Sequence, residues 1–432
     1  MSLAGKTVVL GVSGGIAAYK AAELTRALKQ AGARVRVLMT RGATEFITPL
    51  TLQTLSAEPV ATELFDLTQE SEIGHIQLAD SADVLLVAPA TANVIAKLAA
   101  GIADDLLTTV ALATRARIVV APAMNVHMFG NPVVQQNLER LESRGVRVVT
   151  PAAGFLACGY EGLGRLPEGD VILDEVAAAL APQDLAGESV LVTAGPTREY
   201  LDPVRFLSNR SSGKMGYAIA RAAWRRGARV RLVSGPAALA DPHGVTTVRV
   251  ESAAEMLAAT AAEIAETSVV IAAAAVADYR PGRRIEEKRA KTEGRTNLSL
   301  ETTPDVVASL ARSTVRREDL IVVGFAAETH DVTARARAKL ARKALDLIVA
   351  NDVTQPGAGF DVDTNQVTLI DRDGVTPLPR LEKSEVADAI LDRVVALRAS
   401  RPRRAGGGRR TKVARLVPGS TRSPRRPRSS RS

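Results

Sequence analysis

The stretch Arg117–Phe129, RIVVAPAMNVHMF, determines how the first part of this chain is interpreted. Its first five residues form a compact, largely β-branched apolar run, which predicts a short parallel strand buried on both faces. Pro122 ends that run, and Met124-Asn125 follow where the strand opens into a crevice. Ligands of open α/β sheets bind at this edge, where an uncharged amide can hold a carboxylate or a heterocycle. A plain turn with Asn125 as a helix N-cap is the alternative.

The same arrangement repeats along the first 182 residues. Strands are predicted at Thr7–Val12, Arg34–Met39 and Val84–Ala88, and small or polar residues follow each of them. Helices are expected between the strands, the first from Ile16 to Gly32. This repetition predicts a doubly wound parallel sheet with a crevice along one edge.

The turn after the first strand reads GVSGGIAAYK from Gly11 to Lys20. Its small residues would let backbone N–H groups and the Ser13 hydroxyl approach a phosphate at a helix N-terminus. The glycine spacing differs from the dinucleotide fingerprint, so a mononucleotide phosphate fits better. His75, one of four histidines, precedes another helix-like stretch, where a cap or surface position is the alternative to a functional role.

The bulk composition predicts a globular protein with a basic tail. At 432 residues, with 46% hydrophobic and 24% charged residues, the chain can form two or three well-buried domains. The net charge of +9 belongs to residues 398–432, which hold thirteen Lys or Arg and no Asp or Glu. Without them the chain carries −4. We predict a disordered Arg-rich tail, with nonspecific nucleic-acid contact as the alternative to a purely solvated extension.

Cysteine content and hydropathy predict a cytoplasmic protein. Cys158 is the single cysteine, so no intramolecular disulfide can form and a reducing compartment is expected. The amino terminus runs straight into a predicted strand, without a charged and then apolar signal segment. No apolar run approaches the roughly 18 residues of a membrane span.

A second strand, glycine turn and helix begin after the polar link 182–188, which predicts a domain boundary near residue 183. Ser189–Ala194 is the expected strand, and Ser211–Gly216, SSGKMG, precedes a helix predicted at Tyr217–Arg226. Donors and glycines at a helix start suit a phosphate-bearing ligand, although the spacing is not that of a P-loop.

Three more buried strands are predicted at Val269–Ala275, Leu320–Gly324 and Leu347–Ala350. A helix expected from Asp331 to Leu345 carries two lysines one turn apart on one face. The charge run Glu287–Lys291 follows the first of these strands. Such a run is normally a solvated surface, but after a crevice-forming strand it can also clamp a triphosphate.

Five motifs in the first half, GVSGGIAAYK, GHIQLA, APATAN, PAMN and ACGYEGLGRLPE, occur in the order of the flavin-containing cysteine decarboxylases. Residues 5–182 resemble the amino-terminal half of the bifunctional phosphopantothenoylcysteine decarboxylase/phosphopantothenate–cysteine ligases of coenzyme A biosynthesis. The resemblance implies a flavodoxin-like domain over residues 1–182 that binds FMN. The implied FMN-binding residues are Ser13, Gly14, Gly15, Thr40, Pro89, Thr91 and Asn93.

The resemblance also implies three catalytic residues in this half. His75 would be the essential histidine, Asn125 would fix the substrate carboxylate, and Cys158 would donate a proton from a mobile flap. FMN would oxidise the substrate thiol to a thioaldehyde, so that the carbanion left by CO₂ is stabilised as an enethiolate before hydride returns. Phe129 stands where the family often has tryptophan.

The second half contains DPVRFLSNRSSGKMG, AAAVADYR, TPDVV, GFAAET and LIVANDV, in the order of the ligase half of the same family. This resemblance, over residues 187–397, implies a Rossmann-like ligase domain at 183–397. There, CTP would activate the carboxylate of 4′-phosphopantothenate as an acyl-cytidylate, and the amine of cysteine would then form the amide. Asn209 would bind that acyl-cytidylate, Lys288 would be the essential lysine, and Arg205 would lie in an arm that reaches a dimer partner.

The same resemblance implies that Mg²⁺ accompanies the CTP phosphates. Lys288–Lys291 reads KRAK, where the family usually has Lys-Ile-Lys-Lys. The implied CTP-binding residues are Ala273, Ala274, Ala275, Asp278, Lys288, Pro304, Asp305, Val306, Val307, Phe325, Lys339 and Lys343.

The family's flavin sites lie between subunits of a trimer-based assembly and its ligase halves dimerise, which implies a large homo-oligomer. Two alternatives remain from the sequence: only one half is active, or the chain is a noncatalytic flavin- or nucleotide-binding regulator. The joint presence of five groups favours the bifunctional enzyme, namely His75, Asn125, Cys158, Asn209 and Lys288.

Overall fold

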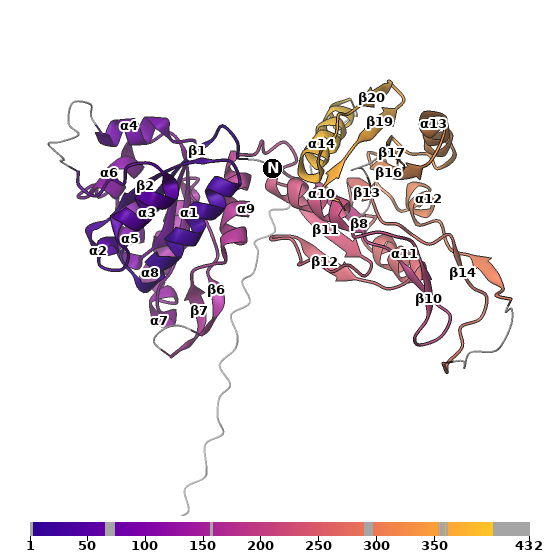
Figure 1. The fold of residues 1–432 in the computed structure, drawn as a ribbon, viewed down its shortest axis with the longest axis horizontal. Coiled ribbons are helices and arrows are strands. Elements are labelled where there is room, and N and C mark those ends of the chain that lie inside the picture. The colour runs from indigo at the N-terminus through magenta and orange to yellow at the C-terminus, as the bar shows by residue number, and fades with distance from the viewer. Residues whose placement is uncertain are drawn as a thin grey trace, which may run out of the picture.

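The computed structural model describes residues 3–64, 74–155, 159–288, 297–352, 354, 359 and 362–400. These residues form two α/β domains, coloured indigo to magenta and pink to yellow in Figure 1. Each is built on one mainly parallel sheet, which confirms the predicted fold class.

The first domain has a five-stranded parallel sheet in the order β2-β1-β3-β4-β5, which is the flavodoxin order. Its strands are β1 (Thr7–Val12), β2 (Arg34–Met39), β3 (Val84–Ala90), β4 (Arg117–Pro122) and β5 (Arg147–Val148), and a hairpin of β6 (Ala152–Phe155) and β7 (Glu161–Arg165) follows them. Its helices are η1 (Ile16–Lys20), α1 (Ala21–Gln30), α2 (Arg41–Thr44), α3 (Pro49–Ser56), α4 (Gly74–Ser81), α5 (Ala92–Ala100), α6 (Leu106–Ala113), α7 (Val126–Phe129), α8 (Pro132–Ser143) and α9 (Gly169–Leu180).

Alternation along the strands produces two cores, one on each face of this sheet. Val8, Leu10 and Val12 of β1 pack with residues of α1 and α9, whereas Val9 packs on the other face with residues of α5, α6 and α8. Because both faces are covered by helices, β1 is apolar throughout, as expected of a buried parallel strand.

The second domain has an eight-stranded sheet in the order β12-β11-β8-β13-β16-β17-β19-β20. The first six positions follow the doubly wound Rossmann order, and β19 and β20 extend the sheet antiparallel. These strands are β8 (Ser189–Ala194), β11 (Arg229–Ser234), β12 (Thr246–Arg249), β13 (Val269–Ala272), β16 (Ile321–Glu328), β17 (Leu347–Asp352), β19 (Val367–Asp371) and β20 (Val375–Pro377).

Helices and short strand pairs surround this sheet. The helices are α10 (Lys214–Arg225), α11 (Ala253–Ala261), α12 (Val306–Ala311), α13 (Val332–Arg342) and α14 (Lys383–Ala399). The antiparallel pairs are β9 (Arg198–Tyr200) with β10 (Phe206–Ser208), β14 (Tyr279–Pro281) with β15 (Leu300–Thr302), and β18 (Thr364–Asn365) with β21 (Leu381–Glu382).

Several boundaries differ from the predictions for physical reasons. The helix expected from Ile16 to Gly32 starts as the 3₁₀ turn η1 and ends at Gln30. Helix α10 begins three residues earlier than predicted because Gly213, with φ of 78°, provides its N-cap. Strand β13 ends at Ala272. Beyond it, the Ala274 N–H donates to the side-chain hydroxyl of Thr193 instead of to a backbone carbonyl of β8.

Strand ends also run further than predicted. β3 and β4 continue to Ala90 and Pro122, which pair after a register shift, so Pro122 does not end the ladder. β16 continues to Glu328 because β17 pairs with it from Val323 to Glu328.

The basic tail begins later than residue 398. Helix α14 runs to Ala399, and the buried Arg398 guanidinium binds Asp319 at 2.8 Å and Glu188 at 3.1 Å. Residues 401–432 lie outside the described residues.

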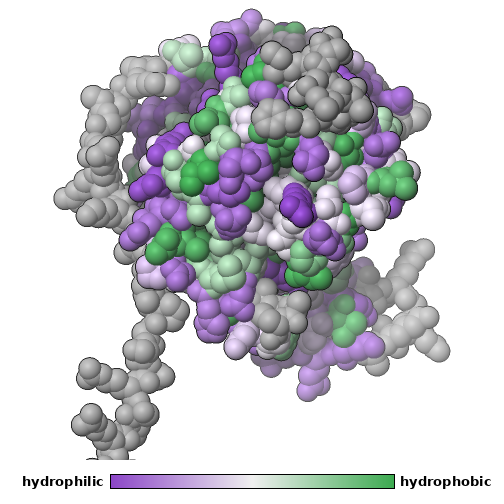
Figure 2. Space-filling model, turned by 90° about the vertical axis from the view of Figure 1, so that its left-hand side faces the viewer, coloured by the Kyte–Doolittle hydropathy of each residue, from purple (hydrophilic) through white to green (hydrophobic). Residues whose placement is uncertain are grey.

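Figure 2 faces the first domain and shows apolar areas scattered among polar ones. Exposed apolar side chains of this domain include those of Leu50, Leu112, Val133 and Phe155. In the described part of the chain, no helix combines the length and the apolar character that a membrane span requires.

Gly216 should be an essential glycine of α10, because a Cβ there would lie 2.5 Å from the Ala194 Cβ and 3.0 Å from the Thr193 carbonyl oxygen. We expect Gly216→Ala to lower the free energy of unfolding by about 1–3 kcal/mol through overpacking. Gly169, at the start of α9, has open space around the same position, so Gly169→Ala should be neutral or stabilise by up to about 1 kcal/mol. Urea unfolding followed by circular dichroism compares the two, and equal stability of both variants would contradict this packing.

Candidate functional site

The main cavity, of about 810 Å³, lies in the second domain at the carboxyl ends of β8, β13 and β16. Strand order reverses between β8 and β13, the position where open α/β sheets bind ligands. The cavity brings together most of the residues predicted for CTP and substrate. These are Asn209, Ala273, Ala274, Ala275, Asp278, Pro304, Asp305, Val306, Val307, Phe325, Lys339 and Lys343.

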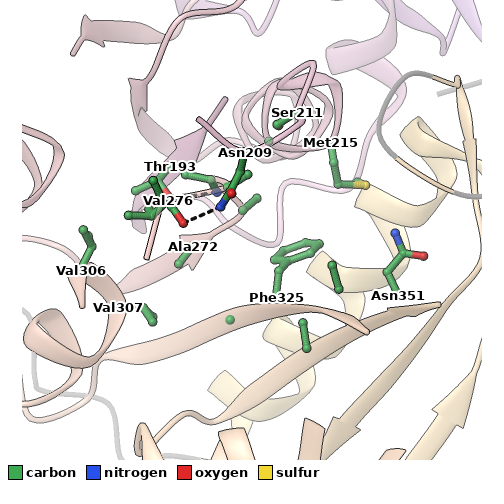
Figure 3. A pocket seen from close by; sticks show the side chains of 18 of the residues that line it. Thr193, Asn209, Ser211, Met215, Ala272, Val276, Val306, Val307, Phe325 and Asn351 are labelled. Carbon is green, nitrogen blue, oxygen red and sulfur yellow. Dashed lines mark hydrogen bonds between the residues drawn. The ribbon is translucent and has the colours of Figure 1, made fainter. Parts of the chain in front are cut away.

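The Asn209 amide has a defined orientation at the wall of this cavity. Its Nδ2 donates to the Val276 carbonyl oxygen at 2.8 Å, as the dashed line in Figure 3 shows. The Thr193 hydroxyl accepts from the Ala274 N–H at 3.2 Å and anchors the strand end beside it. The Asn209 amide carbonyl is therefore held where it can meet a polar group of a bound molecule.

Two lysines from the carboxyl end of α13, Lys339 and Lys343, form a cationic wall of the cavity. Lys339 donates to the Phe325 carbonyl oxygen at 2.7 Å, and burial, followed by the charge of Lys343, lowers the pKa of Lys339. Lys343 binds the Asp305 carboxylate at 2.8 Å. Burial alone would raise the pKa of Asp305, but the bonds from Lys343 and from the Ala308 N–H outweigh it and lower that pKa. Lysines placed in this way can neutralise phosphate oxygens.

The other end of the cavity contains a residue that the sequence analysis did not select. Asn351 is the next-to-last residue of β17 and is 8% exposed, and its Oδ1 atom has no hydrogen-bond partner within the described residues. Figure 3 shows Phe325 between Asn209 and Asn351, with Met215 nearby. In the sequence, Asn351 directly follows the predicted buried strand Leu347–Ala350, so the rule that pointed to Asn125 could also have identified Asn351.

Lys288 and Arg205 do not line this cavity. Lys288 is exposed in the loop after β14, and residues 289–296 lie outside the described residues. That loop is attached to the β9–β10 arm, because the Ile285 N–H donates to the Leu201 carbonyl oxygen at 2.8 Å.

Arg205 is bound within its own arm. Its guanidinium contacts the Asp202 carboxylate at 2.6 Å, and the same carboxylate accepts from the backbone N–H groups of Val204 and Arg205. The bond from Arg205 is the main reason why the pKa of Asp202 falls to about 2, against the opposing effect of burial.

In the first domain, the predicted flavin-binding turns meet between β1 and β3, where strand order also reverses. The buried Ser13 hydroxyl donates to the Pro89 carbonyl oxygen at 2.7 Å and accepts from the Thr91 N–H at 3.0 Å. Ser13 therefore joins the two strand ends. Gly14 permits the tight approach of the next loop, because a Cβ there would lie 2.5 Å from the Gly42 backbone.

Three other predicted residues border the same edge. Thr40 is the N-cap of α2, and its N–H donates to the Val12 carbonyl oxygen at 3.0 Å. Asn93 is exposed in the first turn of α5, while Gly15 precedes η1. Helix starts of this kind offer donors that suit a phosphate group.

Asn125 caps α7, with its Oδ1 accepting from the His127 N–H at 2.8 Å, so the capping alternative describes one of its contacts. The β6–β7 hairpin packs beside this turn. The Met124 N–H donates to the Gly164 carbonyl oxygen at 2.9 Å, and the His127 and Tyr160 rings lie 5.0 Å apart. Cys158, between these strands in the sequence, lies outside the described residues.

His75 is not brought to Asn125 within one chain. It is the second residue of α4, and Figure 1 places α4 and α7 at opposite ends of the first domain. A site that needs both side chains therefore needs a second copy of the domain.

Within the described ranges, no group of three or more His, Cys, Asp or Glu side chains is placed to hold a metal ion. Asp278 and Asp305 are the carboxylates that line the main cavity. Because Mg²⁺ is typically bound by one or two carboxylates together with substrate phosphates, this set fits an ion that arrives with a nucleotide.

Comparisons with known proteins agree with the two-domain division. Residues 1–181 match a family model described as Flavoprotein, and residues 185–397 match the DNA/pantothenate metabolism flavoprotein C-terminal domain. The chain is 50% identical, over 392 residues, to the coenzyme A biosynthesis bifunctional protein CoaBC of Vibrio cholerae, covering 90% of this chain and 98% of that protein.

Two solved structures are similar to one domain each. The crystal structure of the C-terminal domain of a coenzyme A biosynthesis bifunctional protein CoaBC is 44% identical, covers 50% of this chain and 97% of that chain, and gives a TM-score of 0.43. The FMN-dependent cysteine decarboxylase SpaF is 30% identical, covers 40% of this chain and 99% of that chain, and gives a TM-score of 0.36.

Asp202 should hold the arm that carries Arg205. We expect Asp202→Ala to speed hydrogen exchange at the Val204 and Arg205 amides by about tenfold, because both lose a charged acceptor. The pKa of Asp202 is about 2 in the folded chain, below about 3.9 in the unfolded chain. Its protection is therefore complete above pH of about 4 and disappears as the pH falls through 2.

Hydrogen exchange with mass spectrometry measures this difference. Asp373→Ala, which removes an exposed carboxylate paired with Arg393 in another part of the domain, is the control. Equal exchange of the arm amides in both variants would contradict the role given to Asp202.

Proposed function

This chain belongs to the coenzyme A biosynthesis bifunctional protein family, and from that membership we propose how its residues divide the work. The chain is an enzyme with a phosphopantothenoylcysteine synthetase activity and an FMN-dependent decarboxylase activity. The second domain would join 4′-phosphopantothenate to cysteine by using CTP, and the first would decarboxylate the product to 4′-phosphopantetheine. We expect both steps to take place in the cytoplasm.

The observation that carries the ligase assignment is the gathering of the predicted CTP residues around one cavity at the strand-order reversal. Phe325 offers an aromatic face for the base, and Lys339 and Lys343 offer cations for the phosphates. Asp305 pairs with Lys343 before any ligand arrives. A triphosphate would therefore compete with Asp305 for the ammonium group of Lys343, or share that group with Asp305.

Asn209 would bind the activated carboxylate in this reaction. Attack of the 4′-phosphopantothenate carboxylate on the α-phosphorus of CTP forms the acyl-cytidylate and releases pyrophosphate. The cysteine amine then forms the amide and releases CMP. The Asn209 amide is held by Val276, so it can meet the reacting carbonyl with little reorganisation.

Mg²⁺ and the lysine loop complete this proposal. The ion would bind through phosphate oxygens, with Asp278 and Asp305 as the nearby carboxylates. Lys288 would reach the phosphates from the loop that Ile285 attaches to the arm. Arg205 would belong to the same arm, where the ligase domain is expected to meet its dimer partner.

The decarboxylase site would lie at the β1–β3 edge of the first domain. The tight Gly14 turn and the strand ends joined by Ser13 support an FMN cradle. Bound FMN supplies a two-electron sink for the substrate thiol and then returns the electrons. Asn125 would hold the substrate carboxylate at the α7 turn, and Cys158 would deliver a proton from the adjacent hairpin segment.

The placement of His75 supports a homo-oligomer. Because α4 and α7 lie at opposite ends of one domain, His75 would act at a flavin site completed by another subunit. The exposed apolar side chains of the first domain would be covered in such an assembly, since large exposed apolar groups commonly mark interaction surfaces. A trimer-based arrangement of flavin domains, with dimerising ligase domains, satisfies both requirements.

A coupled assay with 4′-phosphopantothenate, cysteine and CTP tests the two activities, with pyrophosphate release and product mass as readouts. We expect Asn209→Ala to lower pyrophosphate release by about 100-fold, because a positioned polar group is lost from the reacting carbonyl. Decarboxylation of added phosphopantothenoylcysteine should continue in this variant. Normal pyrophosphate release by Asn209→Ala would contradict the assignment.

Cys158→Ser should have the reciprocal effect. Pyrophosphate release should be unchanged and CO₂ should still be lost, but the oxidised enethiol product should accumulate, because the serine hydroxyl is a much weaker acid than a thiol. Mass spectrometry distinguishes this product from 4′-phosphopantetheine by two hydrogens. Normal yields of 4′-phosphopantetheine would exclude Cys158 as the proton donor.

A further inference from the structure

Helices α9 and α10 lie at the junction of the two domains. Helix α9 of the first domain faces α10 of the second across the junction in Figure 1. The facing side chains include carboxylates on α9 and arginines on α10, together with the only tryptophan of the chain, Trp224.

The first contact is an ion pair between buried groups. The Asp174 carboxylate of α9, 5% exposed, accepts from the Arg225 Nε of α10 at 3.1 Å. The Arg221 Nε lies 3.5 Å from the other oxygen of the same carboxylate. Asp174 therefore binds two arginines, one turn apart, of the opposite domain.

The second contact surrounds Trp224. The Glu175 carboxylate binds Arg147 of β5 in its own domain and lies 2.7 Å from the Nε2 of His243 in the β11–β12 loop of the other. The Trp224 ring lies edge-on to the His243 ring at 4.8 Å, and the Arg147 guanidinium lies 5.4 Å from its centre. One indole is thus held between a cation of the first domain and an imidazole of the second.

The cluster holds two carboxylates and three guanidinium groups, and the Asp174–Arg225 pair is deeply buried. Burial would raise the pKa of Glu175, but the hydrogen bonds from His243 and Arg147 outweigh it and lower that pKa. A buried charge that loses its partner is strongly destabilising, whereas an exposed surface pair contributes little. Separation of the two domains would therefore be costly, because it would leave these buried charges without their partners.

We propose that Arg147, Asp174 and Glu175 of the first domain and Arg225, Trp224 and His243 of the second form an interdomain clasp, a fixed docking surface for the ligase domain. The clasp holds the last turn of α10. The first turn of the same helix, Lys214–Gly216, borders the main cavity. Because Gly216 seats α10 tightly against Ala194, the flavoprotein domain positions one wall of that cavity.

Trp224 reports on the clasp directly in the full-length protein, without use of either activity. Asp174→Asn keeps the shape of the carboxylate but removes its charge, and Arg225→Gln removes the partner charge from the other domain. We expect each variant to shift Trp224 emission to longer wavelength and to raise quenching by acrylamide, because the indole becomes accessible to water. Arg229→Gln, which removes an exposed ion pair within the second domain, is the matched control and should behave as the wild type.

A charge exchange makes the test specific. Asp174→Arg combined with Arg225→Asp should restore the wild-type emission and quenching that each single reversal loses. Far-UV circular dichroism identifies any variant that has not folded, and Asp174→Asn then carries the test because it alters the side chain least. Wild-type emission and quenching in folded Asp174→Asn and Glu175→Gln, or an equal change in Arg229→Gln, would overturn the proposal.

Discussion

Both sites depend on the reversal of strand order beside the first strand of each sheet. At β1–β3 and at β8–β13, neighbouring crossovers lie on opposite faces, so no connection covers the carboxyl ends of the strands. Short side chains then let the turns approach one another, as at Gly14 in the first domain and Ala273–Ala275 in the second. In both domains, the reversal of strand order leaves the carboxyl ends of the strands open, although the proposed reactions differ.

Polar groups near these edges are positioned before any ligand is bound. Ser13 joins two strand ends, Asn209 is tied to Val276, and Lys343 rests on Asp305. Such pairing lowers the cost of holding flexible lysine and amide side chains in one conformation. The Oδ1 of Asn351 is the exception, because it has no partner among the residues that the structure describes, and a buried acceptor of this kind at a cavity wall is one that a ligand can satisfy.

The completeness of the two sites differs. The main cavity gathers the residues predicted for CTP and substrate within one chain, apart from the Lys288 loop and the Arg205 arm. The flavin edge has Asn125 and the strand ends on one side, but His75 lies at the other end of the domain. With the roles proposed for His75 and Asn125, the decarboxylation requires assembly of several chains, while the proposed clasp at Trp224 would hold the two domains of one chain in a fixed arrangement.

The sequence by itself determined the two α/β domains, their strands and a set of polar and small residues that line the main cavity, because buried parallel strands are continuous apolar runs and polar residues follow their carboxyl ends. It did not select Asn351, whose acceptor is recognised only once burial leaves it without a partner. It placed Arg398 in the tail by composition, although burial against Asp319 and Glu188 keeps that residue in α14. The separation of His75 from Asn125 and the meeting of α9 with α10 were decided by tertiary structure alone, since distances between segments far apart in sequence depend on packing and leave no local pattern.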